Sequence, residues 1–196
     1  MTDVRELETP HGIARVRLHE VDNARAALIL GHGAGGGVAA PDLVIAAKAA
    51  NDVGASVALV EQPYRVAGRR SSPRTAQLDA AWTSVVEQLS LDRVITGGRS
   101  AGARVACRTA AETGSVGVLC LAFPLLPPGA APEKTRRGEL DAVTVPMLVV
   151  QGERDRFGMP TASKTREVVK VAGDHGLKKD RERIAEAVGA WLDGLF

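Results

Sequence analysis

The sequence places one serine where a catalytic nucleophile would stand. The segment GGRSAG at 97–102 holds Ser100; it follows an apolar stretch over 93–97 and precedes a stretch suited to a helix over 100–113. Glycines two residues either side of the serine allow a sharp turn from strand to helix, because they let neighbouring elements approach without a Cβ. The hydroxyl then stands at a helix N-terminus, whose amides favour developing negative charge. The alternative is a serine that only caps the helix.

A serine nucleophile needs a base, and the base needs an acid to orient it. His175 lies in the loop GDHG, after the last apolar strand and before the last helix, which is the expected place for the base. Asp155, in the loop GERDRFG that follows another strand, is the expected acid, in the order serine, aspartate, histidine. Glu153 and Asp174 are local competitors for the role of the acid.

The other three of the four histidines are expected in different roles. His11 belongs to a predicted hairpin turn, far from the catalytic edge, and His19 ends a strand of the same hairpin. His32 follows a buried strand, inside the glycine-rich loop GHGAGGG at 31–37. We expect His32 to contact the substrate.

The glycine-rich loop suits an oxyanion hole, which requires backbone N–H groups rather than special side chains. We expect one N–H from Ala34, in this loop, and the other from Ala101, the residue after the serine. The same glycines also match a dinucleotide-binding loop, for which Glu61 at the end of the next strand would be the acid. That alternative leaves the serine, histidine and aspartate unexplained.

The elements that position these residues alternate along the chain. A hairpin is predicted first, from strands over 4–8 and 13–19, and further strands and helices follow it. Strands are predicted over 26–30, 56–60, 93–97, 116–123, 147–151 and 168–172, and helices over 41–52, 75–89, 100–113 and 179–195, with a shortened helix over 161–166. This alternation predicts an α/β fold: a mostly parallel sheet with an N-terminal antiparallel hairpin and helices on both faces. In such sheets the active site lies beyond the carboxyl ends of the strands.

The composition indicates one globular domain over 1–196. The chain is 45% hydrophobic and 24% charged, with a net charge of +2 and 3% aromatic residues. That charge is too small to indicate a nucleic-acid partner, and aromatic side chains that could stack on bases are scarce. The polar N-terminal segment and the lack of a long apolar run predict a cytoplasmic protein without a membrane partner. The two cysteines form no metal-binding or disulfide pattern.

Several segments together resemble the α/β-hydrolase superfamily. They are LGHGAGGG (30–37), EQPYRVAGRR (61–70), GGRSAGAR (97–104), FPLLPPG (123–129), LVVQGERDRFG (148–158) and GDHG (173–176). More closely, the chain is similar to small lidless bacterial hydrolases grouped with the KANL3/Tex30-like proteins, neighbours of the dienelactone hydrolases. The resemblance implies the α/β-hydrolase fold without a lid domain, a Ser100–Asp155–His175 triad, oxyanion amides at Ala34 and Ala101, and neither metal nor cofactor.

These observations predict a serine hydrolase that cleaves a small-molecule ester or thioester. Arg65, Arg69 and Arg70 follow a strand at the predicted catalytic edge, where they would attract an acidic substrate. The alternative for these arginines is an ordinary solvated loop. For the protein as a whole, the alternatives are a non-catalytic interaction module that kept the fold, and a peptidase.

Overall fold

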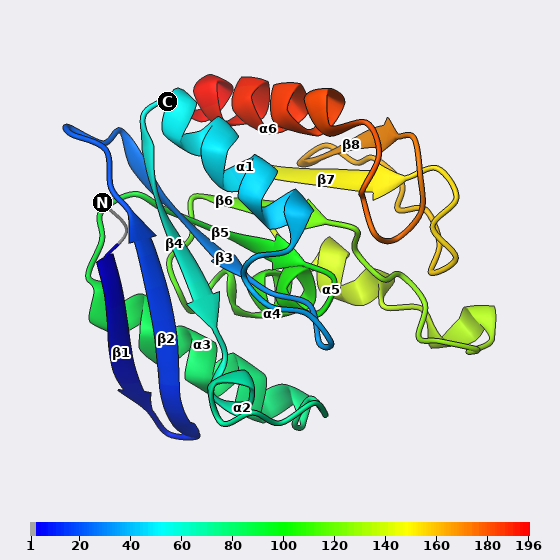
Figure 1. Cartoon of the computed structure of the whole chain (residues 1–196). Helices are drawn as coiled ribbons and strands as arrows, with labels where there is room; N and C mark the ends of the chain where they lie inside the picture. Colours follow the sequence, from blue (N-terminus) through cyan, green and yellow to red (C-terminus); the bar gives the residue numbers. More distant parts are fainter. Residues whose placement is uncertain (1–2) are drawn as a thin grey trace.

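The computed structural model describes residues 3–196, which form one sheet covered by helices on both sides (Figure 1). The strands are β1 (Asp3–Thr9), β2 (Gly12–His19), β3 (Ala26–Gly31), β4 (Ala55–Glu61), β5 (Val94–Arg99), β6 (Gly117–Leu121), β7 (Met147–Gly152) and β8 (Arg166–Val171). The helices are α1 (Pro41–Asp52), α2 (Pro63–Val66), α3 (Thr75–Leu89), α4 (Ala101–Thr109), α5 (Arg137–Asp141) and α6 (Arg181–Leu195), with a 3₁₀ turn over Pro132–Lys134.

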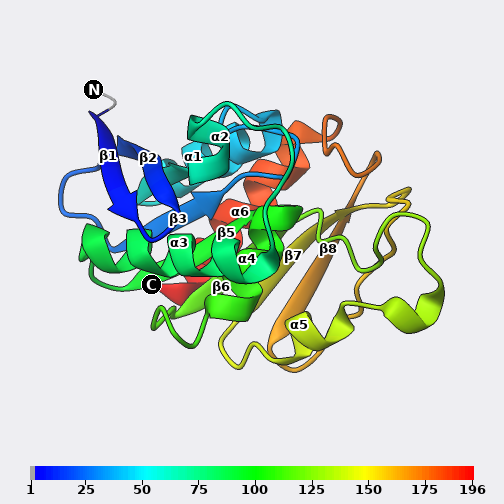
Figure 2. The same cartoon turned by 90° about the horizontal axis from the view of Figure 1, so that it is seen from below.

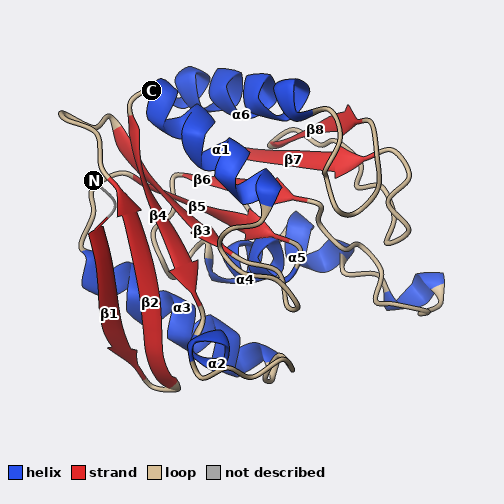
Figure 3. Ribbon diagram, viewed as in Figure 1, coloured by secondary structure: helices blue, strands red, loops and turns tan. Residues whose placement is uncertain are grey.

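The eight strands form a single sheet in the order β1-β2-β4-β3-β5-β6-β7-β8. β1 pairs with β2 and β2 with β4 in antiparallel fashion, and the remaining neighbours are parallel. The carboxyl ends of β3 to β8 therefore meet at one edge of the sheet. The predicted α/β fold, with its hairpin and its mostly parallel sheet, is confirmed (Figure 3).

The helices divide between the two faces of the sheet, and each face has its own core. α1 and α6 lie side by side on one face, while α3, α4 and α5 cover the other (Figures 1 and 2). Strand β3 is buried along its whole length. Leu28 and Leu30 pack in the core under α1 and α6, and Ile29 packs in the core under α3. Full burial of each such side chain contributes about 1.5–3 kcal/mol, which explains why an uninterrupted apolar run marks this central strand.

Three predicted helices differ from those in the structure. The helix predicted over 100–113 is shorter, since α4 ends at Thr109 and a turn follows it. The helix expected over 161–166 is wrong, because residues 161–165 form no helix and Arg166 already begins β8. A six-residue helix advances about 9 Å, too little to return the chain along the sheet to the start of a parallel strand. Helix α6 begins at Arg181 rather than at 179, because Asp180 has a positive φ of 55°. The Asp180 carboxylate instead accepts a hydrogen bond from Ala172 N at 3.1 Å.

The hairpin turn lies at a different edge from the one that the sequence indicated. Because β2 runs antiparallel to β4, Arg15 near the start of β2 pairs with Glu61 at the end of β4. The turn that holds His11 is therefore at the same edge as the carboxyl ends of the parallel strands. The expectation that His11 lies far from the catalytic edge is wrong, although β4 and β3 still separate the hairpin from β5.

The helices in the described part of the chain include none that is both long and apolar enough to cross a membrane.

Candidate active site

Ser100 occupies the turn between β5 and α4 in a strained backbone conformation. Its φ is 52° and its ψ is −107°, a conformation that costs a side-chain-bearing residue about 1–3 kcal/mol. A Cβ on either Gly98 or Gly102 would collide with the carbonyl of Gly31 in β3. The two glycines thus let β3 pass directly against the turn, and a hydrogen bond of 2.9 Å from Ser100 N to Leu121 O fixes the turn to β6.

His175 joins the serine to an aspartate, because each of its ring nitrogens takes part in one hydrogen bond. The His175 Nε2 to Ser100 Oγ distance is 2.9 Å, and the His175 Nδ1 to Asp155 Oδ2 distance is 2.8 Å. The Asp155 side chain is fully buried, while 20% of the His175 side chain is exposed. The three residues that the sequence singled out for nucleophile, base and acid therefore form one hydrogen-bonded chain.

The Asp155 carboxylate is held by two further donors. Gln151 Nε2, from the end of β7, lies 2.9 Å from Oδ2, and Phe157 N donates to Oδ1 at 2.9 Å. The two competing acids are placed differently: Glu153 is exposed, and Asp174 accepts from Gly176 N at 2.9 Å. That bond lowers the pKa of Asp174, with Lys178 and Arg154 nearby adding to the effect. Of the three acids, Asp155 is the one that meets His175.

The glycine-rich loop runs directly beside the serine. A Cβ built on Gly33 would lie 3.5 Å from Ser100 Cβ. Gly36 N donates to Gly33 O at 3.1 Å, which makes a turn with Ala34 at its second position and leaves the Ala34 N–H outside the turn's hydrogen bond. Ala101 is the first residue of α4, so its N–H has no partner within the helix. Neither the turn nor the helix uses these two amides, and their role as donors to an oxyanion stays a prediction.

His32 lies beneath this loop rather than in contact with solvent. It is 3% exposed, and both ring nitrogens are occupied. Gln62 N donates to Nε2 at 3.0 Å, so Nδ1 carries the proton and donates to Gly33 O at 2.8 Å. Burial lowers the pKa of His32 and keeps the ring neutral. The expected substrate contact is therefore wrong, because the ring is used to hold the backbone at Gly33.

The segment after β4 supports the glycine-rich loop from outside. It begins with the short helix α2, in a stretch for which no helix was predicted. The Tyr64 hydroxyl, in α2, donates to Ala34 O at 2.8 Å. Of the three arginines expected to attract substrate, Arg65 is half-buried, and Arg69 and Arg70 are exposed.

Arg69 lines a small hollow that faces the hairpin. His11 and Gln77 line the same hollow. Within residues 3–196, no hydrogen bond or ion pair joins the 65–70 segment to Ser100 or His175. A role of Arg65, Arg69 and Arg70 in attracting an acidic substrate stays a prediction.

Arg99, immediately before the serine, connects three parts of the site and was not among the residues expected there. Its Nε lies 2.8 Å from Oδ2 of Asp42, a buried residue of α1, as an ion pair rather than an aligned hydrogen bond. Its Nη2 donates to His175 O at 2.9 Å. A Cβ on Gly33 would lie 3.0 Å from its Nη1. An arginine in the variable position before the serine is the only sequence signal for this arrangement.

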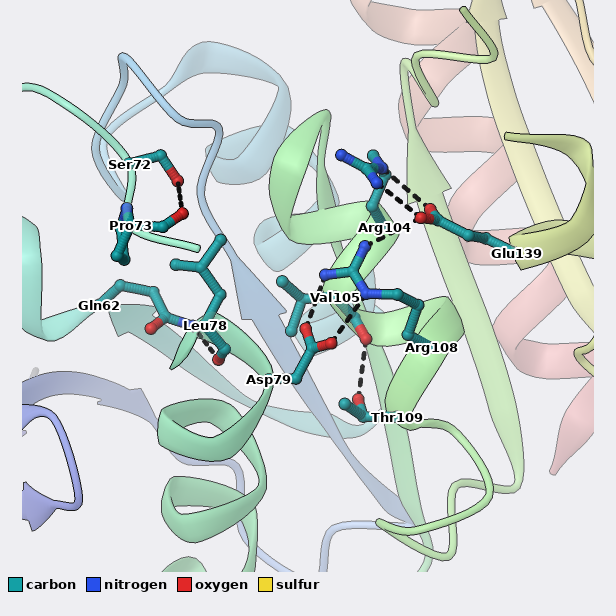
Figure 4. Close-up of polar contacts among 10 residues, drawn as sticks. All are labelled: Gln62, Ser72, Pro73, Leu78, Asp79, Arg104, Val105, Arg108, Thr109 and Glu139. Carbon is teal, nitrogen blue, oxygen red and sulfur yellow. Dashed lines mark hydrogen bonds and ion pairs between the residues drawn. The ribbon is translucent and has the colours of Figure 1, made fainter. Parts of the chain in front are cut away.

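Helix α4 is held in place by ion pairs to the helices on either side (Figure 4). Arg108 binds Asp79 of α3 through two hydrogen bonds of 2.8 and 2.6 Å. Arg104 forms a similar bidentate contact with Glu139 of α5, at 2.9 and 2.6 Å. Arg108 Nη1 also donates a hydrogen bond to Glu139, at 3.2 Å. Such paired, partly buried contacts restrict the helix that begins next to Ser100.

In the part of the chain that the structure describes, no three or more histidine, cysteine, aspartate or glutamate side chains form a group suited to hold a metal ion.

Comparison with known families settles the identity of the fold. Residues 24–188 match the family model described as alpha/beta hydrolase domain. The chain belongs to this family. The dinucleotide-binding alternative is therefore wrong, and Glu61 instead lies 3.7 Å from Arg15 of the hairpin. The narrower likeness to KANL3/Tex30-like proteins stays a prediction.

Solved structures similar to this α/β-hydrolase include a lidless α/β serine hydrolase from Xanthomonas campestris. It is 17% identical with a TM-score of 0.77, and the match covers 97% of this chain and 93% of that one. Est1E from Butyrivibrio proteoclasticus is 16% identical with a TM-score of 0.80, and the match covers 98% of each chain. Dienelactone hydrolase from Anabaena variabilis is 16% identical with a TM-score of 0.77, covering 98% of this chain and 96% of that one. No curated protein sequence is significantly similar to this α/β-hydrolase.

Proposed function

We propose that this α/β-hydrolase cleaves a small ester or thioester through a Ser100–His175–Asp155 triad and an acyl-enzyme intermediate. The observation that carries the proposal is the continuous hydrogen-bonded chain from Ser100 Oγ through both nitrogens of His175 to Asp155 Oδ2. A nucleophile next to a base that a third group orients is the arrangement that nucleophilic acyl transfer requires.

Acylation begins when Ser100 Oγ attacks the carbonyl carbon and its proton passes to His175 Nε2. The carbonyl oxygen becomes an oxyanion, to which the N–H groups of Ala34 and Ala101 donate hydrogen bonds. When this intermediate collapses, the carbon–oxygen or carbon–sulfur bond to the leaving group breaks. His175 gives the proton to the departing alcohol or thiol, and the acyl group stays on Ser100.

Deacylation repeats these steps with water as the nucleophile. His175 Nε2 takes one proton of the water as its oxygen attacks the acyl carbon, and the proton then returns to Ser100 as the acid product leaves. Asp155 accepts the Nδ1–H bond throughout and stabilises the positive imidazolium without taking a proton. Its buried carboxylate, with Gln151 and Phe157 as further donors, keeps the ring in the tautomer that leaves Nε2 free to accept.

Two alternatives make different demands on these residues. A non-catalytic interaction module has no need for a strained serine backbone or for three aligned side chains from three separate loops. A peptidase would use the same residues, and it is distinguished by its substrates alone. The strain at Ser100, about 1–3 kcal/mol, favours a catalytic function, since such strain collects at functional sites.

Labelling by a fluorophosphonate probe tests the proposal, because the probe reacts with an activated serine. The native protein should be labelled and should hydrolyse p-nitrophenyl acetate, and Ser100→Ala should lose both reactions, with kcat lower by about 10⁶. Ser72→Ala, in the exposed loop before α3, is the matched control and should retain both. Labelling of Ser100→Ala at the native level would overturn the proposal. Hydrolysis of a peptide substrate but not of an ester would favour the peptidase.

A further inference from the structure

A hollow beside His175 contains charged groups that the proposed reaction does not use. Its volume is about 370 Å³, and it lies between the loop after β7 and the loop after β8. Arg154, Arg156, Phe157 and Lys178 line it together with His175. The two loops are joined by a hydrogen bond of 2.9 Å from Arg154 N to Gly173 O. The hollow is therefore part of the same framework that holds the candidate acid and base.

The three cations around this hollow form no ion pair and no side-chain hydrogen bond in the described chain. Within residues 3–196, no ion pair involves Arg154, Arg156 or Lys178. One carboxylate, Asp174, also lines the hollow, and its Oδ1 is already bonded to Gly176 N. Three positive charges against one negative charge leave the hollow cationic. A concave surface lined by one sign of charge raises the local concentration of ions of opposite sign.

Arg156 stacks on an aromatic ring that contacts the candidate base. Its guanidinium lies over the ring of Phe157, 4.8 Å from the ring centre. Phe157 in turn meets the His175 ring edge-on, with ring centres 4.6 Å apart and planes at 80°. Stacking on an aromatic face restricts the arginine and leaves its N–H fork free for an oxyacid. Phe157 thus contacts both the guanidinium of Arg156 and the ring of His175.

We propose that this hollow binds an anionic oxyacid group, a carboxylate or a phosphate, on the alcohol or thiol half of the substrate. The inference rests on the proposed function, because it takes His175 as the group that protonates the leaving group. The leaving atom must then come within hydrogen-bond reach of His175 Nε2, whereas the carbonyl oxygen lies toward the loop at Gly33. The half of the substrate that departs is therefore the half that lies beside the cationic hollow.

This assignment uses a different set of cations from the one that the sequence indicated. The sequence indicated Arg65, Arg69 and Arg70 as the cations that attract an acidic substrate. Arg69 lines a hollow on the hairpin side together with His11. Arg154 and Arg156 flank Asp155 in the sequence, and Lys178 follows His175 by three residues. The loops that carry the acid and the base thus also carry the cations proposed to select the substrate.

Two pairs of small esters test which half of the substrate carries the charge. The leaving-group pair is 4-acetoxybenzoate and its neutral methyl ester, methyl 4-acetoxybenzoate. The acyl pair is 4-nitrophenyl hemisuccinate and 4-nitrophenyl butyrate. Each kcat/KM is divided by the rate constant for hydroxide hydrolysis of the same ester, which removes differences in intrinsic reactivity. We expect the anionic member of the leaving-group pair to be favoured about tenfold at low salt, because three exposed cations contribute about twofold each.

Variants identify the cations responsible. The triple variant Arg154→Gln, Arg156→Gln and Lys178→Gln should bring the ratio in the leaving-group pair to about one, and Arg156→Gln alone should lower it about twofold to fourfold. Arg17→Gln, which removes an exposed arginine of β2, is the matched control for the loss of one positive charge and should keep the native ratio. Raising the salt concentration to about 0.5 M should reduce the native preference toward that of the triple variant.

The possible outcomes separate this inference from the proposed function. Absence of a preference at low salt, or a preference that the triple variant retains, overturns the inference while ester hydrolysis itself stands. A preference confined to the acyl pair overturns the assignment to the leaving group. Loss of the preference in Arg70→Gln but not in the triple variant returns the role to the segment after β4. If Ser100-dependent turnover of the neutral esters is absent, the proposed function fails and the inference falls with it.

Discussion

Arg99 Nη2 donates a hydrogen bond of 2.9 Å to the carbonyl oxygen of His175, so the residue before the candidate nucleophile holds the loop of the candidate base. The same guanidinium forms an ion pair with Asp42, whose side chain is completely buried at the start of α1. Burial raises the pKa of Asp42, and the charge of Arg99 opposes that rise. One side chain thus compensates a buried carboxylate and sets the position of His175.

Replacing Arg99 should affect both stability and catalysis. Arg99→Met leaves the Asp42 carboxylate buried without a counter-charge, and we expect it to lower the free energy of unfolding by about 3 kcal/mol. Arg99→Lys keeps the charge but loses the fork that reaches His175 O. It should retain most of the stability while kcat falls about tenfold to a hundredfold at nearly constant KM. Urea unfolding and p-nitrophenyl acetate kinetics measure the two effects, and native stability in Arg99→Met would show that the pair contributes nothing.

The role of Asp155 is tested by a change that preserves its shape. Asp155→Asn presents an N–H₂ group or an uncharged oxygen to His175 Nδ1, which disturbs the tautomer and removes the charge that stabilises the imidazolium. We expect kcat to fall by about 10⁴ with an unchanged fold. Glu153→Gln, two residues earlier and exposed, is the matched control and should keep full activity. If Glu153→Gln were the variant with the large loss, the acid would be Glu153 instead.

His32 should make stability depend on pH. Because its pKa in the folded state is lowered by burial, the unfolded chain binds a proton at higher pH than the folded chain does. Its contribution to stability is therefore complete above the ordinary histidine pKa of about 6.5 and decreases as the pH falls below that value. Urea unfolding at pH values of about 7.5 and about 5.5, on either side of that pKa, should show this loss in the native protein. In His32→Gln the difference between the two pH values should be smaller, and an equal difference would assign the pH dependence to other groups.

The chain length of the acyl group is a further test. The connection from Phe123 to Met147 contains a 3₁₀ turn and the short helix α5, and α5 is bound to α4 through Glu139 and Arg104 (Figure 4). A long acyl chain needs an apolar trough, at about 0.8 kcal/mol per buried CH₂. We expect kcat/KM for p-nitrophenyl esters to be highest for acetyl or butyryl groups, without interfacial activation. A maximum at C8 or longer would reveal a trough in this connection.

Features of this protein that depend on local sterics could be predicted from short stretches of sequence. The glycines around Ser100 predicted a close approach to a neighbouring strand, and a Cβ at Gly98 or Gly102 would indeed meet the carbonyl of Gly31. Continuous apolar runs predicted buried strands, and the helices over 41–52 and 75–89 have the bounds that their sequence patterns predicted. Each of these signals is contained in a few consecutive residues, so it can be interpreted without knowing what packs against them.

Features that depend on contacts between distant residues could not be predicted in this way. His32 is buried, and the donor that satisfies its Nε2 is the backbone N–H of Gln62, thirty residues away. Arg99 joins α1 to the His175 loop, and nothing within its own segment indicates either partner. The cationic hollow arises because β7 and β8 are neighbours, which brings the loops that follow them together. Hydrogen bonds and charge clusters of this kind form between segments that only the folded chain places side by side.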